Sequence, residues 1–516
     1  MVTRGVAAAL LAGFSVRVAV MLLGHYVRGS SSLDHDFVGM GLADRPELCT
    51  PMTCPRRFLE GAFRLDAFKS LPAAYSGGSY NGQPIPVMVL AAISKLPSPA
   101  VHVLRICWAL VDIVGALALY ALAKFISGSP HSEADRARDR RALKHYRAEK
   151  KALIALVSNK EDSPEKVEWG SILSAARFHD IDKAAAFARR HASAKAALDD
   201  DNGAVVDDSS SMLSAKSLPG TLCAFYVLNP ITFLVWASGS FGAIANAVVL
   251  AALSLNAGEI NRFSWCGAAS AALAVYLEPF FAMPALALFL CRSTSLPSSR
   301  APHLSPISFG VLFLLCFFTL LLIPVAYSLT FRETVQATMR RWTIWYASSP
   351  DLTPTVGLYW YFFTEVFPSF QRYFLLVFHV HPFVYQMPLM RTFAHRSNVA
   401  AHALVMVYSV LRPFPSLADL SMILSLILTH PLLVRRLRKM FAVAVGISIS
   451  LALMPVMWHL WIYPGSANAN YYYNQTLVYN FFVAMLVLEW IAAAVRREKV
   501  LKKFANVDES EKKKVA

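Results

Sequence analysis

Residues 441–495 are FAVAVGISISLALMPVMWHLWIYPGSANANYYYNQTLVYNFFVAMLVLEWIAAAV, two apolar runs joined by a short polar turn. The runs extend from Phe441 to Ile462 and from Leu477 to Val495. A helix needs about 20 apolar residues to cross roughly 30 Å of hydrocarbon, because all its backbone polar groups must be paired inside the lipid. We therefore expect two membrane helices whose connection lies at a membrane surface.

Similar apolar segments recur along the whole chain, so we predict an all-α polytopic membrane protein with about eleven to thirteen hydrophobic segments. The other long ones are Gly5–Val27, Ala100–Ile126, Leu218–Trp236, Phe241–Leu255, Trp265–Leu290, Ile307–Leu329, Tyr373–Met390, Val399–Leu411 and Leu417–Val434. Two shorter segments, Ile85–Leu96 and Val356–Phe367, are read as re-entrant or tilted. The length of the first segment, without a small-residue cleavage site, favours an anchor over a removed signal peptide.

The composition agrees with a lipid environment and argues against nucleic-acid binding. Of 516 residues, 56% are apolar and 16% are charged, and the net charge is +16. The basic residues flank apolar spans, as they do where Lys and Arg hold loops on the cytoplasmic side and contact anionic lipid headgroups. We expect the membrane as a partner and no nucleic acid.

Charge placement divides the chain into four parts. We predict N-terminal membrane helices over residues 1–129 with a lumenal loop over 28–83, and a charged, partly disordered, cytoplasmic loop over 130–216. The main bundle then covers 217–495, followed by a basic cytoplasmic tail over 496–516. A full crossing by Ile85–Leu96 would put the charged loop on the lumenal side if Met1 is cytoplasmic, and a re-entrant segment would not.

The chain ends in Lys513-Lys514-Val515-Ala516. Lysines at the fourth and third positions from the carboxyl end match the dilysine signal of endoplasmic-reticulum membrane proteins, with a solvated basic tail as the alternative. Because Arg496 and Arg497 also mark this side as cytoplasmic, we predict a multi-pass protein of the endoplasmic reticulum with a cytoplasmic carboxyl end.

The sequence contains no hydrolase, phosphate-loop or zinc-protease motif, so we expect no catalytic residue, cofactor or metal. The one enzymatic hint is Asp34-His35-Asp36, since a carboxylate in such a loop is able to bind a metal or act as a base in lipid-linked glycosyl transfer. Cys49 and Cys54 occupy the same polar segment, and the sequence leaves open whether they form a disulfide.

Ionisable residues within the apolar spans indicate a polar interior, because each is costly in lipid without a partner or a wet cavity. Ion pairs between helices and ligand binding both remain open for each of them. They are Arg17, Asp112, Glu278, Glu365, Asp419, His459 and Glu489.

Two stretches depart from plain lipid-facing composition. SSPDLTPTVGLYWYFFTEVF, residues 348–367, begins with two prolines and continues into an aromatic cluster. MPVMWHLWIYPGSANANYYYNQT, residues 454–476, is an apolar helix end followed by a polar turn. Asn468 and Asn470 in that turn offer donors and acceptors for the phosphate or sugar groups of a lipid. An ordinary helix-connecting loop is the equally weighted alternative.

These two stretches resemble the phosphatidylinositol-glycan class U (PIG-U) family of glycosylphosphatidylinositol (GPI) transamidase subunits. The family's Pro-Asp-Leu-Thr-Pro segment stands here at residues 350–354, followed by Gly357-Leu358 and by the aromatic run 360–363. Its Trp-His-Leu-Trp-Ile-Tyr block stands at 458–463 after Pro455, and leads into 465–470. Asn81-Gly82-Gln83 replaces the family's His-Glu-Thr, and the regions 130–216 and around the two cysteines are longer than the family's.

The resemblance implies a non-catalytic subunit that presents the GPI lipid for attachment to proteins, on a fold like that of the multi-helix (GT-C-like) mannosyltransferases. The implied partners are a caspase-like cysteine protease subunit, PIG-T-, PIG-S- and GAA-like subunits, the GPI glycolipid and the carboxyl-terminal signal of the proprotein. The residues implied to contact GPI are Asn468, Asn470, His459, Trp458, Ser466 and Tyr471. A lipid-linked mannosyltransferase using Asp34 or Asp36 is the first alternative, and a transporter is the second.

Overall fold

The computed structural model describes residues 4–28, 42–76, 78–93, 98–128, 217–257, 264–282, 284–285, 306–330, 348, 351–394 and 396–515. The chain divides into two compact units. The larger unit combines Met1–Phe125 with Pro219–Ala494, and the smaller one combines Ile126–Leu218 with Val495–Ala516. The membrane helices and the candidate site lie in the larger unit. Asp34-His35-Asp36 and the loop 130–216 lie outside the described residues.

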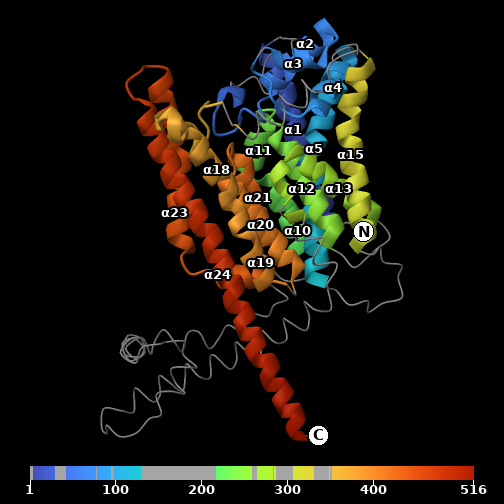
Figure 1. The fold of residues 1–516 in the computed structure, drawn as a ribbon, viewed down its shortest axis with the longest axis vertical. Helices are drawn as coiled ribbons and strands as arrows, with labels where there is room; N and C mark the ends of the chain where they lie inside the picture. The colour runs from blue at the N-terminus through green and yellow to red at the C-terminus, as the bar shows by residue number, and fades with distance from the viewer. Residues whose placement is uncertain are drawn as a thin grey trace. The chain divides into compact units, whose positions relative to one another are not determined.

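The first half of the described chain consists of helices and contains no strand (Figure 1). The helices are α1 (Arg4–Arg28), η1 (Leu42–Asp44), α2 (Pro55–Phe68), α3 (Leu71–Ser76), α4 (Pro84–Ile93), α5 (Ser98–Gly128), α10 (Leu218–Leu228), α11 (Pro230–Ala237), α12 (Gly242–Ala257), α13 (Ser264–Leu277) and η5 (Pro279–Phe281).

The second half is likewise helical wherever it is described. It contains α15 (Pro306–Thr330), α17 (Tyr359–Glu365), α18 (Pro368–Val384), α19 (Gln386–Thr392), α20 (Ser397–Leu411), α21 (Leu417–Leu428), α22 (Pro431–Val434), α23 (Met440–Ile462) and α24 (Ala469–Val515). The predicted all-α class is therefore confirmed for the described residues.

Four described helical stretches are long and apolar enough to cross a membrane, namely Trp108–Ser127, Ile307–Ser328, Met440–Ile462 and Ala469–Lys499. The pair α10 and α11, bent by 44°, makes a fifth if it is one broken span. Six shorter apolar helices accompany them. The chain is thus a polytopic membrane protein, as predicted, in which many apolar segments are shorter than a full crossing.

Proline explains where the predicted spans are interrupted, because its ring cannot donate a hydrogen bond and disfavours helix in the preceding residue. The segment predicted over Leu218–Trp236 breaks at Asn229, whose side chain caps α11 before Pro230. The segment predicted over Leu417–Val434 breaks at His430 before Pro431. The segment predicted over Trp265–Leu290 was too long as one helix, since α13 ends at Leu277 and a 3-10 turn begins at Pro279.

A buried ion pair joins the first helices of the bundle. Arg17 on α1 donates to Asp112 on α5 from Nη2 at 2.6 Å and from Nε at 3.1 Å, and both side chains are 1% exposed. The guanidinium also donates to the carbonyl of Val227 at 3.0 Å and lies over the ring of Trp236. Such a buried charge is tolerated because it is paired, and the Arg17 guanidinium is hydrogen-bonded to both the carboxylate and backbone carbonyls. For Arg17 and Asp112, the structure therefore shows an ion pair between two helices.

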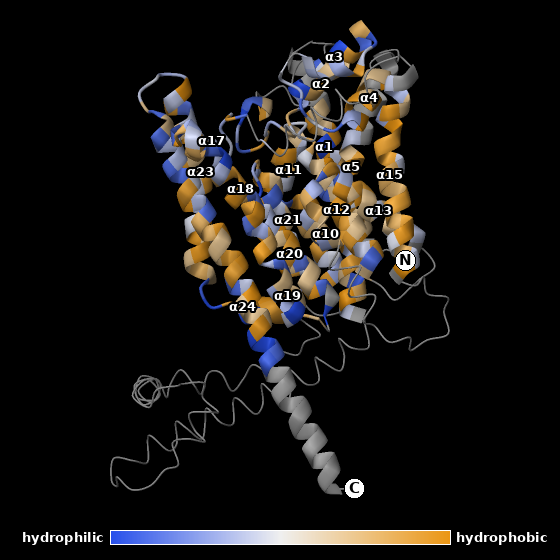
Figure 2. Cartoon of the chain, viewed as in Figure 1, coloured by the Kyte–Doolittle hydropathy of each residue, from blue (hydrophilic) through white to orange (hydrophobic). Residues whose placement is uncertain are grey.

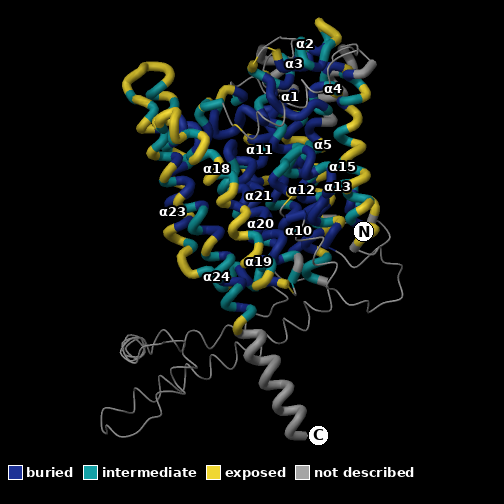
Figure 3. The backbone as a smooth tube through the Cα atoms, viewed as in Figure 1, coloured by how far each residue is buried: buried dark blue, intermediate teal, exposed yellow. Residues whose placement is uncertain are grey.

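Hydropathy and burial separate the middle of the larger unit from one of its ends. The helices α5, α12, α15 and α20 are mostly apolar along their length, whereas α2, α3 and α17 carry more polar residues (Figure 2). Residues of α12, α20 and α21 are largely buried, while α15 and α18 expose much of their apolar surface (Figure 3). That exposed surface suits contact with lipid.

Candidate functional site

A tight polar turn connects α23 to α24. Gly465 adopts φ +63°, a left-handed conformation that a residue without Cβ reaches at no steric cost. The backbone N–H of Ala467 donates back to the carbonyl of Leu460 at 3.2 Å. The side-chain oxygen of Asn468 then accepts from the backbone N–H of Asn470 at 3.0 Å, and α24 begins between them. Because this hydrogen bond uses only the side-chain oxygen of Asn468, the side-chain N–H₂ group is able to donate to a ligand.

The two helices of this hairpin approach closely at Gly446. A Cβ atom built on Gly446 of α23 would lie 2.3 Å from the ring of Phe482 on α24. The backbone segment before α17 is fixed to the same hairpin, since Asn480 donates to the carbonyl of Val356 at 2.6 Å. The hairpin therefore holds the turn beside α17, although the two are about a hundred residues apart in the chain.

Stacked aromatic rings join α17 to the hairpin. Tyr361 stacks on Tyr473 with 4.3 Å between ring centroids, and its hydroxyl hydrogen-bonds the side-chain oxygen of Asn470. Trp360 stacks on Trp461 with 6.2 Å between centroids. Aromatic pairs of this kind contribute about 0.5–1.5 kcal/mol beyond their area. They form a rigid platform that presents both ring faces and hydroxyl or amide groups.

A cleft of about 490 Å³ opens beside this platform. We call it the aromatic cleft. Its lining residues are Leu352, Pro354, Trp360, Tyr361, Thr364, Glu365, Trp461, Asn468, Ala469 and Asn470. A volume in this range suits a small polar group or part of a larger ligand.

An arginine from α2 anchors the wall of the cleft formed by Leu352 and Pro354. Arg57 forms an ion pair with Asp351 and donates to the hydroxyl of Thr353 at 3.0 Å. Asp351 also accepts from the backbone N–H of Thr353 at 2.9 Å. Partial burial would raise the pKa of Asp351, but the hydrogen bonds from Thr353 and Arg57 and the Arg57 charge outweigh it and hold that pKa below its ordinary value.

Glu365 gives the aromatic cleft a negative charge. It is the only carboxylate among the residues lining the cleft, and the described side chains include no ion-pair partner for it. It lies at the carboxyl end of α17, where the helix dipole also favours a cation. The cleft thus combines ring faces, amide groups and one carboxylate, which suits a ligand with hydroxyl groups and an amine.

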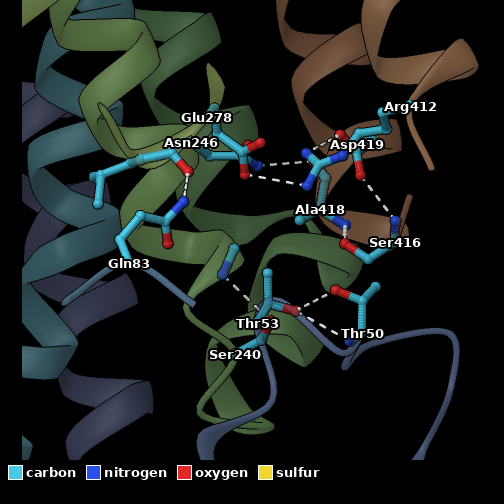
Figure 4. Close-up of polar contacts among 12 residues, drawn as sticks. Thr50, Thr53, Gln83, Ser240, Asn246, Glu278, Arg412, Ser416, Ala418 and Asp419 are labelled. Atoms are coloured by element: carbon cyan, nitrogen blue, oxygen red, sulfur yellow. Dashed lines mark hydrogen bonds and ion pairs between the residues drawn. The ribbon is translucent and has the colours of Figure 1, made fainter. Parts of the chain in front are cut away.

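A second polar cluster lies elsewhere in the same unit, and we call it the polar centre (Figure 4). Arg412, which follows α20, donates to Asp419 at 3.0 Å and to Glu278 at 3.1 Å. Asp419 accepts from the backbone N–H of Ser416 at 2.8 Å and completes a capping box at the start of α21. The adjoining cavity measures about 10 Å³, which is room for about one water molecule.

A sequence model of the PIG-U family, described as GPI transamidase subunit PIG-U, matches residues 35–479. The chain belongs to the PIG-U family. The resemblance drawn from the two sequence blocks is thereby confirmed. Both blocks contribute to the lining of the aromatic cleft, since Leu352, Pro354 and Trp360 come from one and Trp461 and Asn468 come from the other.

Individual PIG-U relatives are similar over about half of the chain. The GPI-anchor transamidase component PIGU of Cricetulus griseus is 29% identical over 302 residues, and that of Homo sapiens is 28% identical over 302 residues. Each match covers 55% of this chain and 65% of the relative. The GPI transamidase component GAB1 homolog of Schizosaccharomyces pombe is 30% identical over 294 residues, covering 55% of this chain and 68% of the relative. The chain thus spans less than two thirds of the first two relatives.

The structure separates the residues that the PIG-U resemblance implied as GPI contacts. Asn468 and Asn470 line the aromatic cleft. Trp458 lies behind the platform, packed on Trp461 and Tyr472 with 5.4 Å between centroids in both pairs. The remaining three are exposed and do not line the cleft: His459, Ser466 and Tyr471.

Sequence reasoning assigned no site role to several cleft residues. Tyr361 stood within a block quoted for the PIG-U resemblance, and Glu365 stood out as an ionisable group in an apolar span. Nothing in the linear sequence pairs Tyr361 with Asn470, which is 109 residues away. Arg57 gave no signal, since an arginine in a polar loop is unremarkable without the contact to Asp351. The described residues contain no cluster of three or more His, Cys, Asp or Glu side chains suited to a metal ion.

Proposed function

We propose that this chain is a non-catalytic subunit of GPI transamidase in the endoplasmic-reticulum membrane, and that its aromatic cleft binds the headgroup of the GPI lipid. The observation that carries the proposal is the cleft itself, in which two distant sequence blocks of a PIG-U family member meet around amides, stacked rings and one carboxylate. The names of the relatives, as GPI transamidase components, support the same activity.

The chemistry of the cleft matches that of a GPI headgroup. The ligand carries sugar hydroxyls, phosphates and amines. The rings of Tyr361 and Trp461 suit contact with sugar rings, and the amides of Asn468 and Asn470 suit hydroxyl and phosphate oxygens. Glu365 supplies the counter-charge for an amine. Trp458 supports the platform, while His459, Ser466 and Tyr471 form an exposed rim that contacts the lipid outside the cleft.

In this proposal the chemistry belongs to partner subunits. A caspase-like cysteine protease subunit cuts the carboxyl-terminal signal of the proprotein, and PIG-T-, PIG-S- and GAA-like subunits complete the complex. The carboxyl end of α24 is cytoplasmic, because Arg496 and Arg497 follow its apolar part. The opposite end of the bundle, with the aromatic cleft and the 28–83 loop, then faces the lumen. Residues 130–216 form a cytoplasmic loop and 496–516 a basic tail.

The direct test replaces both cleft amides. In cells that depend on this chain, Asn468→Ala combined with Asn470→Ala should lower GPI attachment about tenfold or more, because two headgroup hydrogen bonds of about 1 kcal/mol each are lost. Unprocessed proprotein and complete GPI should accumulate together. Pull-down of the partner subunits should remain at the level of the unaltered chain, since neither amide is buried.

Asn474→Ala is the matched control, because this exposed amide lies on the same helix outside the cleft. It should leave attachment unchanged. Normal surface levels of anchored proteins in the double variant would refute the headgroup site. Accumulation of an under-mannosylated GPI precursor would instead favour a mannosyltransferase.

A further inference from the structure

The loop before α2 brings two cysteines together. Residues 45–54 fold into successive tight turns, in which the backbone N–H of Cys49 donates to the carbonyl of Arg45 at 3.0 Å and that of Cys54 donates to the carbonyl of Thr50 at 2.9 Å. Neither cysteine forms a disulfide in the structure, and the side chain of Cys49 hydrogen-bonds that of Cys54. Side chains in contact across two such turns lie within reach of a disulfide.

The turns are held in place by the rest of the bundle. The carbonyl of Glu47 accepts from the backbone N–H of Leu417 at 2.8 Å, and the carbonyl of Thr53 accepts from the backbone N–H of Phe241 at 3.0 Å. The hydroxyl of Thr53 also accepts from the backbone N–H of Thr50 at 3.0 Å (Figure 4). The contact between the thiols is therefore part of a fixed loop, which lowers the entropic cost of joining them.

The two cysteines have unequal environments. Cys49 is 8% exposed, while Cys54 is more accessible and stands at the N-cap of α2. The hydrogen bond from Cys49 lowers the pKa of Cys54 to about 6 against the effect of burial, with smaller contributions from the backbone N–H groups of Arg57 and Arg56 and from the Arg57 charge. The greater accessibility of Cys54, its position at the start of α2 and its lowered pKa all make it the more reactive thiol of the pair.

We infer that Cys49 and Cys54 form a dithiol–disulfide modification site in which Cys54 is the attacking thiol and Cys49 the resolving one. The inference rests on the lumenal placement of this loop in the proposed function, since the lumen of the endoplasmic reticulum sustains disulfides. It requires no catalytic role for the chain.

The chemistry is ordinary thiol–disulfide exchange with an oxidant that is itself a disulfide, such as oxidised glutathione or an oxidised protein disulfide isomerase. The Cys54 thiolate attacks one sulfur of the oxidant, which forms a mixed disulfide and releases one thiolate. Cys49 loses its proton and attacks the Sγ atom of Cys54, which forms the Cys49–Cys54 bond and releases the second thiolate. The two cysteine sulfurs lose two electrons in total, and the oxidant gains them as two thiolates, one of which takes up the proton of Cys49.

A Cys49–Cys54 disulfide would lie next to the contacts that anchor one wall of the aromatic cleft. Cys54 precedes the first turn of α2, and Arg57 in that turn holds Asp351 and Thr353 of the cleft wall. A disulfide would fix the start of α2 covalently to the turn that contacts α21. The modification site is in this way mechanically connected to the wall formed by Leu352 and Pro354.

The test measures the thiol state of the full-length chain in its own membranes. Exchange is stopped with acid, free thiols are then alkylated with N-ethylmaleimide at neutral pH in denaturant, and the chain is digested with trypsin without reduction. No Lys or Arg lies between the cysteines, so both remain in one peptide. We expect this peptide to be two hydrogens lighter and unalkylated, and to take two alkyl groups only after reduction. Two alkyl groups without reduction, or a bridge from either cysteine to another one, would overturn the inference.

The order of attack is tested on the detergent-solubilised complex with oxidised glutathione as probe. Cys49→Ser should trap a glutathione adduct on Cys54, and Cys54→Ser should form the adduct on Cys49 more slowly by about threefold or more, since Cys49 is buried. Cys316→Ser on α15 is the control and should still form the Cys49–Cys54 bond. Equal adduct rates in the two variants would contradict the assigned roles. The thiol state is read independently of GPI attachment, so failure here leaves the cleft proposal to its own test.

Discussion

The aromatic cleft and the polar centre both place ionisable groups within a membrane protein, but they treat charge in opposite ways. In the polar centre, Arg412 satisfies Glu278 and Asp419 at once, and the remaining space is about 10 Å³. In the aromatic cleft, Glu365 stands without a described ion-pair partner beside about 490 Å³ of open volume. One arrangement is complete by itself and the other is completed only by a ligand.

The difference shows how to read charged residues in apolar spans. A buried charge that has its partner and its hydrogen bonds indicates a structural connection, as for Arg17 with Asp112 and for the polar centre. A carboxylate that is open to a cleft lined by amides and rings indicates recognition. The comparison predicts that variants of the polar centre reduce stability, whereas variants of the cleft reduce ligand binding in a folded protein.

The largest expected effect is on the polar centre. Arg412→Ala leaves Glu278 and Asp419 buried together without a cation, and it should destabilise the chain by about 3–5 kcal/mol. Thermal unfolding of the detergent-solubilised chain, followed by size-exclusion chromatography, should show a markedly lower melting temperature or no folded peak. Arg438→Ala is the control, since this arginine is exposed, and it should leave the melting temperature unchanged. If the Arg412→Ala protein is as stable as the unaltered chain, the polar centre does not stabilise the fold as proposed.

The next effect belongs to the cleft. Glu365→Gln keeps the size of the side chain and removes its charge, so binding of an amine-bearing headgroup should weaken about tenfold, in line with a hydrogen bond to a charged group. The melting temperature of the free chain should not change, because Glu365 is exposed. Binding of a GPI headgroup analogue to the solubilised complex measures the effect. A loss of stability without a loss of binding would place Glu365 with the structural charges instead.

The sequence predicts where the helices lie better than it predicts which helices pack against each other. The long spans are recognisable because lipid demands a run of apolar residues, and the predicted segments Ile307–Leu329 and Phe441–Ile462 differ from α15 and α23 by at most one residue at either end. The shorter elements are less regular, since prolines divide them and the apolar pattern alone does not show which piece pairs with which. The GT-C-like arrangement of the helices stays a prediction.

The same limit applies to the candidate site. The Pro-Gly turn with Asn468 and Asn470 is predictable because amides follow an aromatic belt at the end of a membrane helix. The direction of each side chain is not, since α23 is apolar on every face and gives no periodicity to orient His459. The contributions of Tyr361 and Arg57 depend on contacts across 109 and 294 residues, which one sequence does not reveal.

A smaller effect is expected at the wall of the cleft. Asp351→Asn removes the charge that holds Arg57 and should weaken headgroup binding about fivefold, because a partly exposed ion pair contributes about 1 kcal/mol or less. The pKa of Asp351 is held below its ordinary value in the folded protein, so its stabilising effect is fully present above that ordinary value and is lost only as the pH falls through the lowered one. The ratio of binding constants between the unaltered chain and the variant should therefore stay constant from about pH 5 to pH 8. A ratio that falls towards one at pH 5 would show that another group anchors the wall.

The smallest effect isolates a single hydroxyl. Tyr361→Phe keeps the ring stacked on Tyr473 and removes the hydrogen bond to the side-chain oxygen of Asn470. An exposed hydrogen bond of this kind contributes about 0.5 kcal/mol, so headgroup binding should weaken about twofold. Tyr361→Ala also removes the ring and should cost several times more, because the platform loses its stacking partner. If the two variants bind equally weakly, the cleft recognises its ligand through the hydroxyl and the amide; if Tyr361→Phe binds normally, ring faces provide the recognition and Asn470 acts without being oriented by Tyr361.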